Sequence, residues 1–208
     1  HGLARAGGLH LASAPCSLLG EAAQVLWRAV RQGVIGKPLL VYAELDDGFI
    51  SQSPYRGWLS ESGAPWPFAD EFRVGCTMEH AGYYLTWLIA IFGPVRRVVA
   101  ASGEVDANKL PDAGPMAPDV SVAVLFFDGG VMARLTCSIV APHDHAIRIF
   151  GETGTLEMAE CWDNDAAVRL RQRRRLRRRL VELPWTKRLR LGGPSHPKVP
   201  RRGPAAMN

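Results

Sequence analysis

Hydrophobic positions recur every three or four residues in two stretches of the chain, which is the spacing of an amphipathic helix. The first stretch follows Ser17 and ends near Gly33, where a left-handed residue suits a helix C-terminus. The second runs from Gly75 to Pro94 and is largely apolar. Both stretches are predicted helices. The second also carries four polar or ionisable residues near its start, namely Glu79, His80, Tyr83 and Tyr84.

Short β-rich segments account for much of the remaining chain. The residues after Lys37 alternate partly and predict a strand, and two hairpins are predicted to turn at Asp128-Gly129-Gly130 and at Glu152-Thr153-Gly154. The second turn lacks the Lys-Ser/Thr of a phosphate-binding loop. Because serial hairpins build antiparallel sheets, the pattern predicts an α+β fold. Its core is an open, mostly antiparallel β-sheet with helices packed on one face.

A long segment rich in Pro, Gly, Ser and Trp, Ser51 to Arg73, separates the predicted strand from the second helix. Loops of this length inside a compact domain are usually functional or disordered, and aromatic side chains need a surface to pack on. We therefore expect the loop to line or cover a substrate. Aromatic faces pack on sugar C–H groups, and an arginine binds a carboxylate or hydroxyl. The candidate substrate-binding residues are Trp66, Phe68, Arg73 and Tyr83, with Trp58 beside them.

The composition narrows the class of protein. With 208 residues, 47% of them hydrophobic, the chain is long enough for one good-sized domain. No apolar run approaches the roughly 20 residues that cross a bilayer. The four cysteines form no C-x-x-C pair, which argues against a zinc ribbon or a dense disulfide framework. A reducing, cytoplasmic location is the expectation.

The net charge of +5 is concentrated in one segment. Residues 169–190 contain eleven Lys or Arg and one acidic residue, so this segment carries +10 and the rest of the chain −5. Such a run could bind a polyanion or an anionic membrane in a salt-sensitive way. It has one aromatic residue, Trp185, whereas single-strand-binding surfaces interleave several. We favour an amphipathic element with a solvated basic face.

The start of the second helix holds the strongest candidate chemistry. His80 and Tyr84 are four residues apart and therefore share a helix face, and Glu79 and Tyr83 form the neighbouring pair. A His–Tyr pair could relay a proton, provided that a nearby cation lowers the tyrosine pKa from about 10. The alternative is a pair of polar core residues that satisfy each other. Spacing alone leaves both interpretations open.

Two further imidazoles, His143 and His145, fall on one side of an extended segment and suggest a metal site. No third ligand is recognisable by spacing. The sequence therefore predicts an ordinary exposed loop entering a strand, and no metal.

Several of these segments together resemble the C-terminal part of the Gfo/Idh/MocA family of NAD(P)-dependent oxidoreductases. The resemblance covers about Leu9 to Met158. It rests on the order of three features: a G-x-I-G turn at Gly33–Gly36, a helix ending in Phe-Gly, and an I-x-G-x-x-G-x-L hairpin at Ile149–Leu156. It implies a chain that lacks most of an N-terminal Rossmann domain. Residues 1–20 would end that domain, and residues 21–208 would form the substrate-binding and oligomerisation sheet.

The resemblance also implies roles for individual residues. When the family's G-G-x-x-x-D-x-G-x-H motif is aligned through Gly82, its Asp position falls on His80 and its His position on Tyr84. Both residues depart from the common pattern. Tyr84 is the expected proton-transfer residue, with His80 and Glu79 as neighbours that orient it or tune its charge. Pro15 and Cys16 would lie near the cofactor, NAD or NADP.

The expected function is hydride transfer between NAD(P) and a sugar-like or polyol hydroxyl, in a homodimer or tetramer formed through the sheet. The chain alone, as a fragment, is expected to be inactive. Two alternatives remain. One is a catalytically silent binding or dimerisation module of the same fold, and the other is a polyanion-binding protein that uses residues 169–190.

Overall fold

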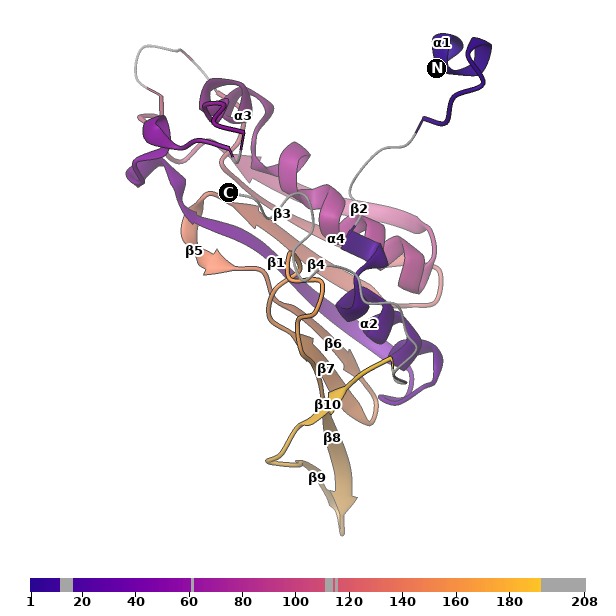
Figure 1. Cartoon of the computed structure of the whole chain (residues 1–208). Coiled ribbons are helices and arrows are strands. Elements are labelled where there is room, and N and C mark those ends of the chain that lie inside the picture. The colour runs from indigo at the N-terminus through magenta and orange to yellow at the C-terminus, as the bar shows by residue number, and fades with distance from the viewer. Residues whose placement is uncertain (12–16, 61, 111–113, 115, 192–208) are drawn as a thin grey trace.

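One open sheet of ten strands organises the molecule (Figure 1). The computed structural model describes residues 1–11, 17–60, 62–110, 114 and 116–191. The strands are β1 (Pro38–Phe49), β2 (Val95–Gly103), β3 (Val120–Phe127), β4 (Met132–Ser138), β5 (Val140–Asp144), β6 (Ile147–Gly151), β7 (Gly154–Met158), β8 (Val168–Leu176), β9 (Arg179–Glu182) and β10 (Lys187–Leu189). Their order is β10-β8-β7-β6-β1-β4-β3-β2, with β5 paired to β1 and β9 paired to β8.

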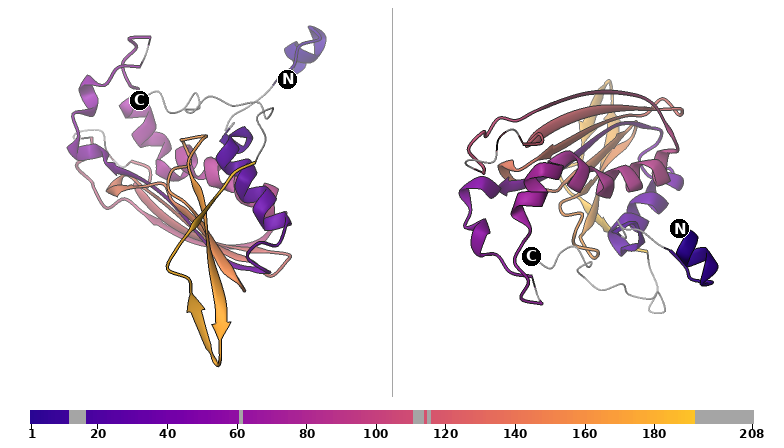
Figure 2. Two further views of the ribbon diagram at one scale, coloured as in Figure 1. Left: turned by 60° about the horizontal axis from the view of Figure 1, so that its bottom comes forward. Right: turned by 90° about the horizontal axis from the view of Figure 1, so that it is seen from above.

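The strand pairs are antiparallel except for β1 and β4, which run parallel. The helices are α1 (Gly2–Ala6), α2 (Glu21–Arg31), α3 (Phe68–Val74) and α4 (Cys76–Phe92), with short 3-10 turns at Ser17–Leu19, Ile50–Gln52 and Tyr55–Gly57. Seen from above, α2, α3 and α4 lie on the same side of the sheet (Figure 2). The predicted α+β fold is confirmed.

The core lies between these helices and the central strands. The β1 residues Val41, Ala43 and Leu45 are fully buried, and α4 contacts β1, β3 and β4. From α4, the side chains of Trp87 and Leu88 pack into this layer. Burying a side chain of this size stabilises a fold by about 1.5–3 kcal/mol. No helix among the described residues is both long and apolar enough to cross a membrane.

Both predicted hairpins form, between β3 and β4 and between β6 and β7. The second is closely packed. A Cβ on Gly151 would lie 2.3 Å from the Ile35 carbonyl oxygen, and one on Gly154 would lie 2.7 Å from the Arg171 carbonyl oxygen. These glycines therefore let the backbone of other segments approach, and the turn is filled by protein atoms. The hairpin interpretation is confirmed.

The structure describes only part of the segment that is expected to end a Rossmann domain. Residues 1–20 are predicted to end a Rossmann domain, and within them Gly8–Leu11 are exposed and form no strand. Residues 12–16, which include Pro15 and Cys16, lie outside the described residues. The division at residue 20 therefore stays a prediction.

The basic segment forms strands β8, β9 and β10, and its arginines and lysine are exposed or half-buried. On β8, the apolar side chains of Val168 and Leu170 are buried while that of Arg169, between them, is exposed. Because side chains alternate with period two along a strand, the start of β8 has one buried and one exposed face. The expected solvated basic face is present, but the apolar face is limited to the start of β8, because Leu176 and Leu180 are exposed.

Candidate functional site

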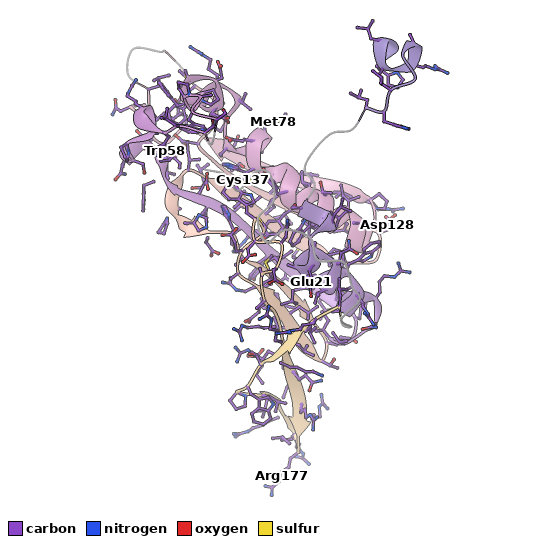
Figure 3. All side chains as sticks on the ribbon, in the orientation of Figure 1. Glu21, Trp58, Met78, Asp128, Cys137 and Arg177 are labelled. Carbon is purple, nitrogen blue, oxygen red and sulfur yellow. The ribbon has the colours of Figure 1, made fainter. Side chains whose placement is uncertain are left out.

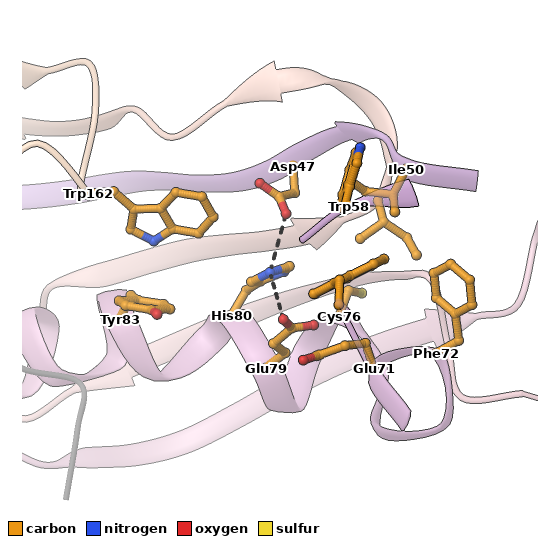
Figure 4. Close-up of a pocket in the computed structure, with 12 residues that line it drawn as sticks. Asp47, Ile50, Trp58, Glu71, Phe72, Cys76, Glu79, His80, Tyr83 and Trp162 are labelled. Atoms are coloured by element: carbon orange, nitrogen blue, oxygen red, sulfur yellow. Dashed lines mark ion pairs between the residues drawn. The ribbon is translucent and has the colours of Figure 1, made fainter. Parts of the chain in front are cut away.

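The start of α4 and the end of β1 meet at a recess in the helix-covered side of the sheet (Figure 4). Gly75, just before α4, lets the segment that precedes β3 pack closely against the start of the helix. Its φ is +83°, and a Cβ there would lie 2.6 Å from the Cβ of Ala117. On β1, the pairing register with β5 shifts between Asp46 and Gly48, so Asp47 sits at a β-bulge. Bulges re-aim side chains, and here the Asp47 carboxylate lies beside His80.

The recess is small, with a volume of about 70 Å³, and adjoins a groove of about 890 Å³. The two share Asp47, Ile50, Trp58, Trp66 and Trp162 as lining residues. Glu71, Glu79, His80 and Tyr83 line the recess alone. Apolar and aromatic walls with a few convergent ionisable groups are typical of small-molecule sites.

His80 is almost fully buried in the recess, at 4% exposure. Its Nε2 lies 3.6 Å from Asp47 Oδ2 and 3.8 Å from Glu79 Oε1. Burial lowers the pKa of His80, although the Asp47 carboxylate opposes this shift. A neutral imidazole beside a carboxylate can accept a proton and then be stabilised as the imidazolium.

Glu79 pairs with a second carboxyl group in the same recess. Burial, and then a hydrogen bond and the negative charge of Glu71, raise the pKa of Glu79 to about 9. At neutral pH, Glu79 is therefore expected to be a carboxylic acid that can donate a hydrogen bond, because two adjacent carboxylates disfavour a second charge.

This raised pKa predicts how stability depends on pH. Between the usual glutamate pKa of about 4.3 and the raised value, folded Glu79 holds a proton that the unfolded chain releases. The free energy of unfolding should therefore fall as the pH rises from about 5 to about 9, with a slope on the order of one proton. In Glu79→Gln this contribution disappears and the profile becomes flatter. Urea titrations across this pH range measure both slopes.

Glu182→Gln, at an exposed position of β9, is the matched control and should follow the wild-type profile. A Glu79→Gln variant with the wild-type slope would show that Glu79 keeps an ordinary pKa in the folded protein.

Tyr84 does not face the recess, contrary to the sequence expectation. Its side chain is fully buried, and its hydroxyl donates a hydrogen bond to the carbonyl oxygen of His145. Burial raises the pKa of Tyr84 well above 10, and the ring packs edge-on against Trp87. This phenol has a structural role, since no substrate hydroxyl can reach it in this arrangement. The position of Tyr84 therefore does not support its predicted role in proton transfer.

Tyr84→Phe should therefore lower stability and leave ligand binding in the recess intact. The variant leaves a buried carbonyl without its donor, which costs about 1–3 kcal/mol. Chemical denaturation measures the loss. Tyr42→Phe, on a half-buried strand position, is the control and should change stability by less than about 0.5 kcal/mol. A fully stable Tyr84→Phe variant with impaired catalysis would restore the original assignment.

Of the predicted substrate-binding residues, two line the recess and two do not. Trp66 and Tyr83 line the recess, as expected of substrate-binding residues. Phe68 instead packs against Tyr55, with ring centroids 5.2 Å apart. Arg73 is exposed and pairs with Asp70 at 3.2 Å, outside the lining of both cavities, so its predicted substrate contact is not supported.

Sequence reasoning missed the residues that complete the site. His145 was expected in an exposed loop, but it is 1% exposed and its ring packs on Trp162 at 4.3 Å. Burial opposes a charge on His145, but Asp47 and then other neighbours, including Glu160, outweigh it and raise its pKa to about 11. Asp47 and Glu160 carry no local signal, because they approach the histidines only through sheet pairing.

The basic segment is remote from this site. Arg177, at the tip of the β8–β9 hairpin, and Trp58, beside the groove, lie at opposite ends of the molecule (Figure 3). Residues of β8, β9 and β10 are absent from the lining of the recess and the groove. The basic surface therefore takes no part in the recess.

Comparisons with known proteins agree with this architecture. The GFO/IDH/MocA C-terminal domain model matches residues 23–157. No curated protein sequence matches the chain. An inositol dehydrogenase homologue from Azotobacter vinelandii, solved with NADH and myo-inositol, superposes with a TM-score of 0.60 at 16% identity. That alignment covers 88% of this chain and 44% of the relative.

Two further solved structures extend the comparison. The WlbA dehydrogenase from Bordetella pertussis, in complex with NADH and UDP-GlcNAcA, has a TM-score of 0.56 at 22% identity, over 76% of this chain and 42% of its own. An NAD binding oxidoreductase from Klebsiella pneumoniae has a TM-score of 0.60 at 19% identity, and the alignment covers 88% of this chain and 48% of the relative. The chain thus spans less than half the length of each. The fold, the helix-to-sheet order and the matched domain together establish that this chain belongs to the GFO/IDH/MocA family.

Proposed function

We propose that this chain is the substrate-binding half of an NAD(P)-dependent oxidoreductase that acts on a hydroxyl group of a sugar-like molecule or polyol. The observation that carries the proposal is the His80–Asp47 pair at the inner end of an aromatic groove. Solved relatives bound to myo-inositol or UDP-GlcNAcA support this substrate class.

The groove has the chemistry that a polyol requires. The indoles of Trp58, Trp66 and Trp162 offer apolar faces to C–H surfaces, while Asp47 and Tyr83 offer polar groups to hydroxyls. A molecule with alternating C–H and O–H groups can satisfy both kinds of wall. A purely apolar ligand would use the indole walls alone.

His80 replaces Tyr84 as the proposed proton-transfer residue. Oxidation of an alcohol to a ketone removes a hydride from carbon and a proton from oxygen, and the nicotinamide supplies the hydride acceptor when bound. The Nε2 atom of His80 accepts the hydroxyl proton, and the Asp47 carboxylate, 3.6 Å away, stabilises the resulting imidazolium. In the reverse direction the imidazolium returns the proton to the alkoxide oxygen.

The described residues fit the substrate side of this reaction and not the nucleotide phosphates. The glycine-rich turn at Gly151–Gly154 is filled by the backbone of Ile35 and Arg171, which occupies the place of a phosphate group. Pro15 and Cys16 stay predicted neighbours of the cofactor, outside the described residues.

We further propose self-association through the uncovered face of the sheet. Val122 and Met132 are 40% and 38% exposed, and the ring of Phe126 lies on the same strand face beneath Arg97. Light scattering should give a homodimer or tetramer. A cytoplasmic location remains part of the proposal, and the three described cysteines, which are free and buried, agree with a reducing compartment.

Two measurements test the function. The chain is titrated with myo-inositol and with a UDP-sugar while tryptophan fluorescence is followed, and the full-length protein is assayed for reduction of NAD⁺ or NADP⁺ by the same compounds. Saturable quenching together with turnover supports the proposal. Binding without turnover in the full-length protein would favour a silent binding module, and the absence of both would overturn the assignment.

A further inference from the structure

A cluster of two imidazoles and two carboxylates lies where the groove meets the sheet. Asp47 comes from the bulge of β1, His143 from β5, and His145 follows directly after β5. Glu160 follows β7 and forms an isolated bridge with His145. Asp47 and His143 both line the 890 Å³ groove, so one side of the cluster is accessible to small molecules.

The Glu160 carboxylate orients both imidazoles. Its Oε2 lies 2.9 Å from His143 Nε2, and its Oε1 lies 3.0 Å from His145 Nδ1. The remaining nitrogen of each ring turns toward a single atom, Asp47 Oδ1. That oxygen is 3.5 Å from His145 Nε2 and 4.0 Å from His143 Nδ1.

The inner nitrogen of the cluster is left without a hydrogen bond. His145 Nε2 is buried and has no hydrogen-bond partner among the described residues, although it is directed at the Asp47 carboxylate. A buried polar atom without a hydrogen bond is costly, and such an atom calls for an explanation. A bound cation between this nitrogen and Asp47 Oδ1 supplies one.

We propose that Asp47, His143 and His145 bind a divalent transition-metal ion of the zinc class. The three donor atoms lie within 4.8 Å of one another. Tetrahedral ligands with bonds of about 2.0–2.1 Å are separated by about 3.3–3.4 Å, so small inward shifts close the site. A carboxylate behind a metal-bound imidazole, the place of Glu160, is the usual outer support of such ligands.

The ligand chemistry selects the class of ion. Two imidazole nitrogens and one carboxylate oxygen suit Zn²⁺, Co²⁺ or Fe²⁺, whereas Mg²⁺ and Ca²⁺ prefer all-oxygen sites. When a metal ion displaces the His145 proton, both imidazoles are neutral and the two carboxylates give the cluster a charge of −2, which a divalent cation balances. The fourth position faces the groove, where water or a ligand hydroxyl can occupy it. The proposed site shares Asp47 with the His80–Asp47 pair, but it is tested by metal binding and not by turnover.

The test uses the full chain, stripped with a chelator and titrated with Zn²⁺ in a calorimeter. One ion per chain with micromolar or tighter affinity is expected, and excess Mg²⁺ should not compete. His143→Ala removes a ligand whose side chain is half exposed, so the fold should survive, and affinity should fall at least tenfold. Glu160→Gln should weaken binding by about 10–100-fold.

His10→Ala, at an exposed histidine, is the matched control and should bind like the wild type. Co²⁺ spectra identify the ligands, because Cys161 lies beside His145 and Glu160 in an alternative set. An intense thiolate charge-transfer band would overturn the proposed set in favour of Cys161. No Zn²⁺ binding, or binding that His143→Ala leaves unchanged, would overturn the site and leave a protonated His145 paired with two carboxylates.

Discussion

His80→Gln is expected to lower the turnover of the full-length enzyme by about 10²–10⁴-fold, the usual contribution of a positioned acid–base group. Glutamine keeps much of the volume and a hydrogen-bonding end but cannot take up the proton. The affinity of this variant for a polyol should change by less than about threefold, since the aromatic walls supply the contacts to the ligand. Steady-state kinetics with myo-inositol, together with fluorescence titration, separate the two effects.

His10→Gln serves as the control, because His10 is exposed and absent from the lining of the recess and the groove. It should retain wild-type turnover. If His80→Gln also turned over at the wild-type rate, His80 would not be the proton acceptor, and Glu79 would become the next residue to test.

Trp87→Ala is expected to cause the largest loss of stability, about 3–5 kcal/mol, as for other buried Trp-to-Ala changes. Trp87 is 1% exposed, its Nε1 donates to Ser17 Oγ at 3.1 Å, and its ring packs on Tyr84. Removing the indole opens a cavity between α4 and the sheet and leaves the Ser17 hydroxyl without this partner. Because domains are stable by only about 5–15 kcal/mol, the loss should be visible in a urea titration.

Trp185→Ala removes the same side chain from a position that is 66% exposed, and it should change stability by less than about 0.5 kcal/mol. Equal effects of the two substitutions would mean that α4 does not pack on the sheet as described.

The local pattern of the chain was enough to predict the elements. The helix at Cys76–Phe92 and the hairpin turning at Asp128–Gly130 follow from apolar spacing and turn residues. Turns and helices are decided by interactions within a few residues, so sequence carries them directly. The order of these elements also sufficed to suggest the family.

The orientation of α4 could not be obtained in this way. The helix is largely apolar, so no single apolar stripe identifies the side that meets the sheet. His80 and Tyr84 share a face, yet the sheet gives them different surroundings. His80 lines the recess, while Tyr84, one turn later, is enclosed by Trp87 and the His145 backbone.

The sequence by itself therefore determined the fold class, the helix that carries the candidate site residues and the aromatic loop near it. Only the tertiary structure decided which side chains meet. Asp47, His80, His145 and Glu160 lie far apart along the chain, and β-sheet pairing with a bulge at Asp47 brings their polar atoms within 4 Å of a neighbour. Such contacts depend on strand register and helix packing, which short-range patterns of polar and apolar residues do not encode.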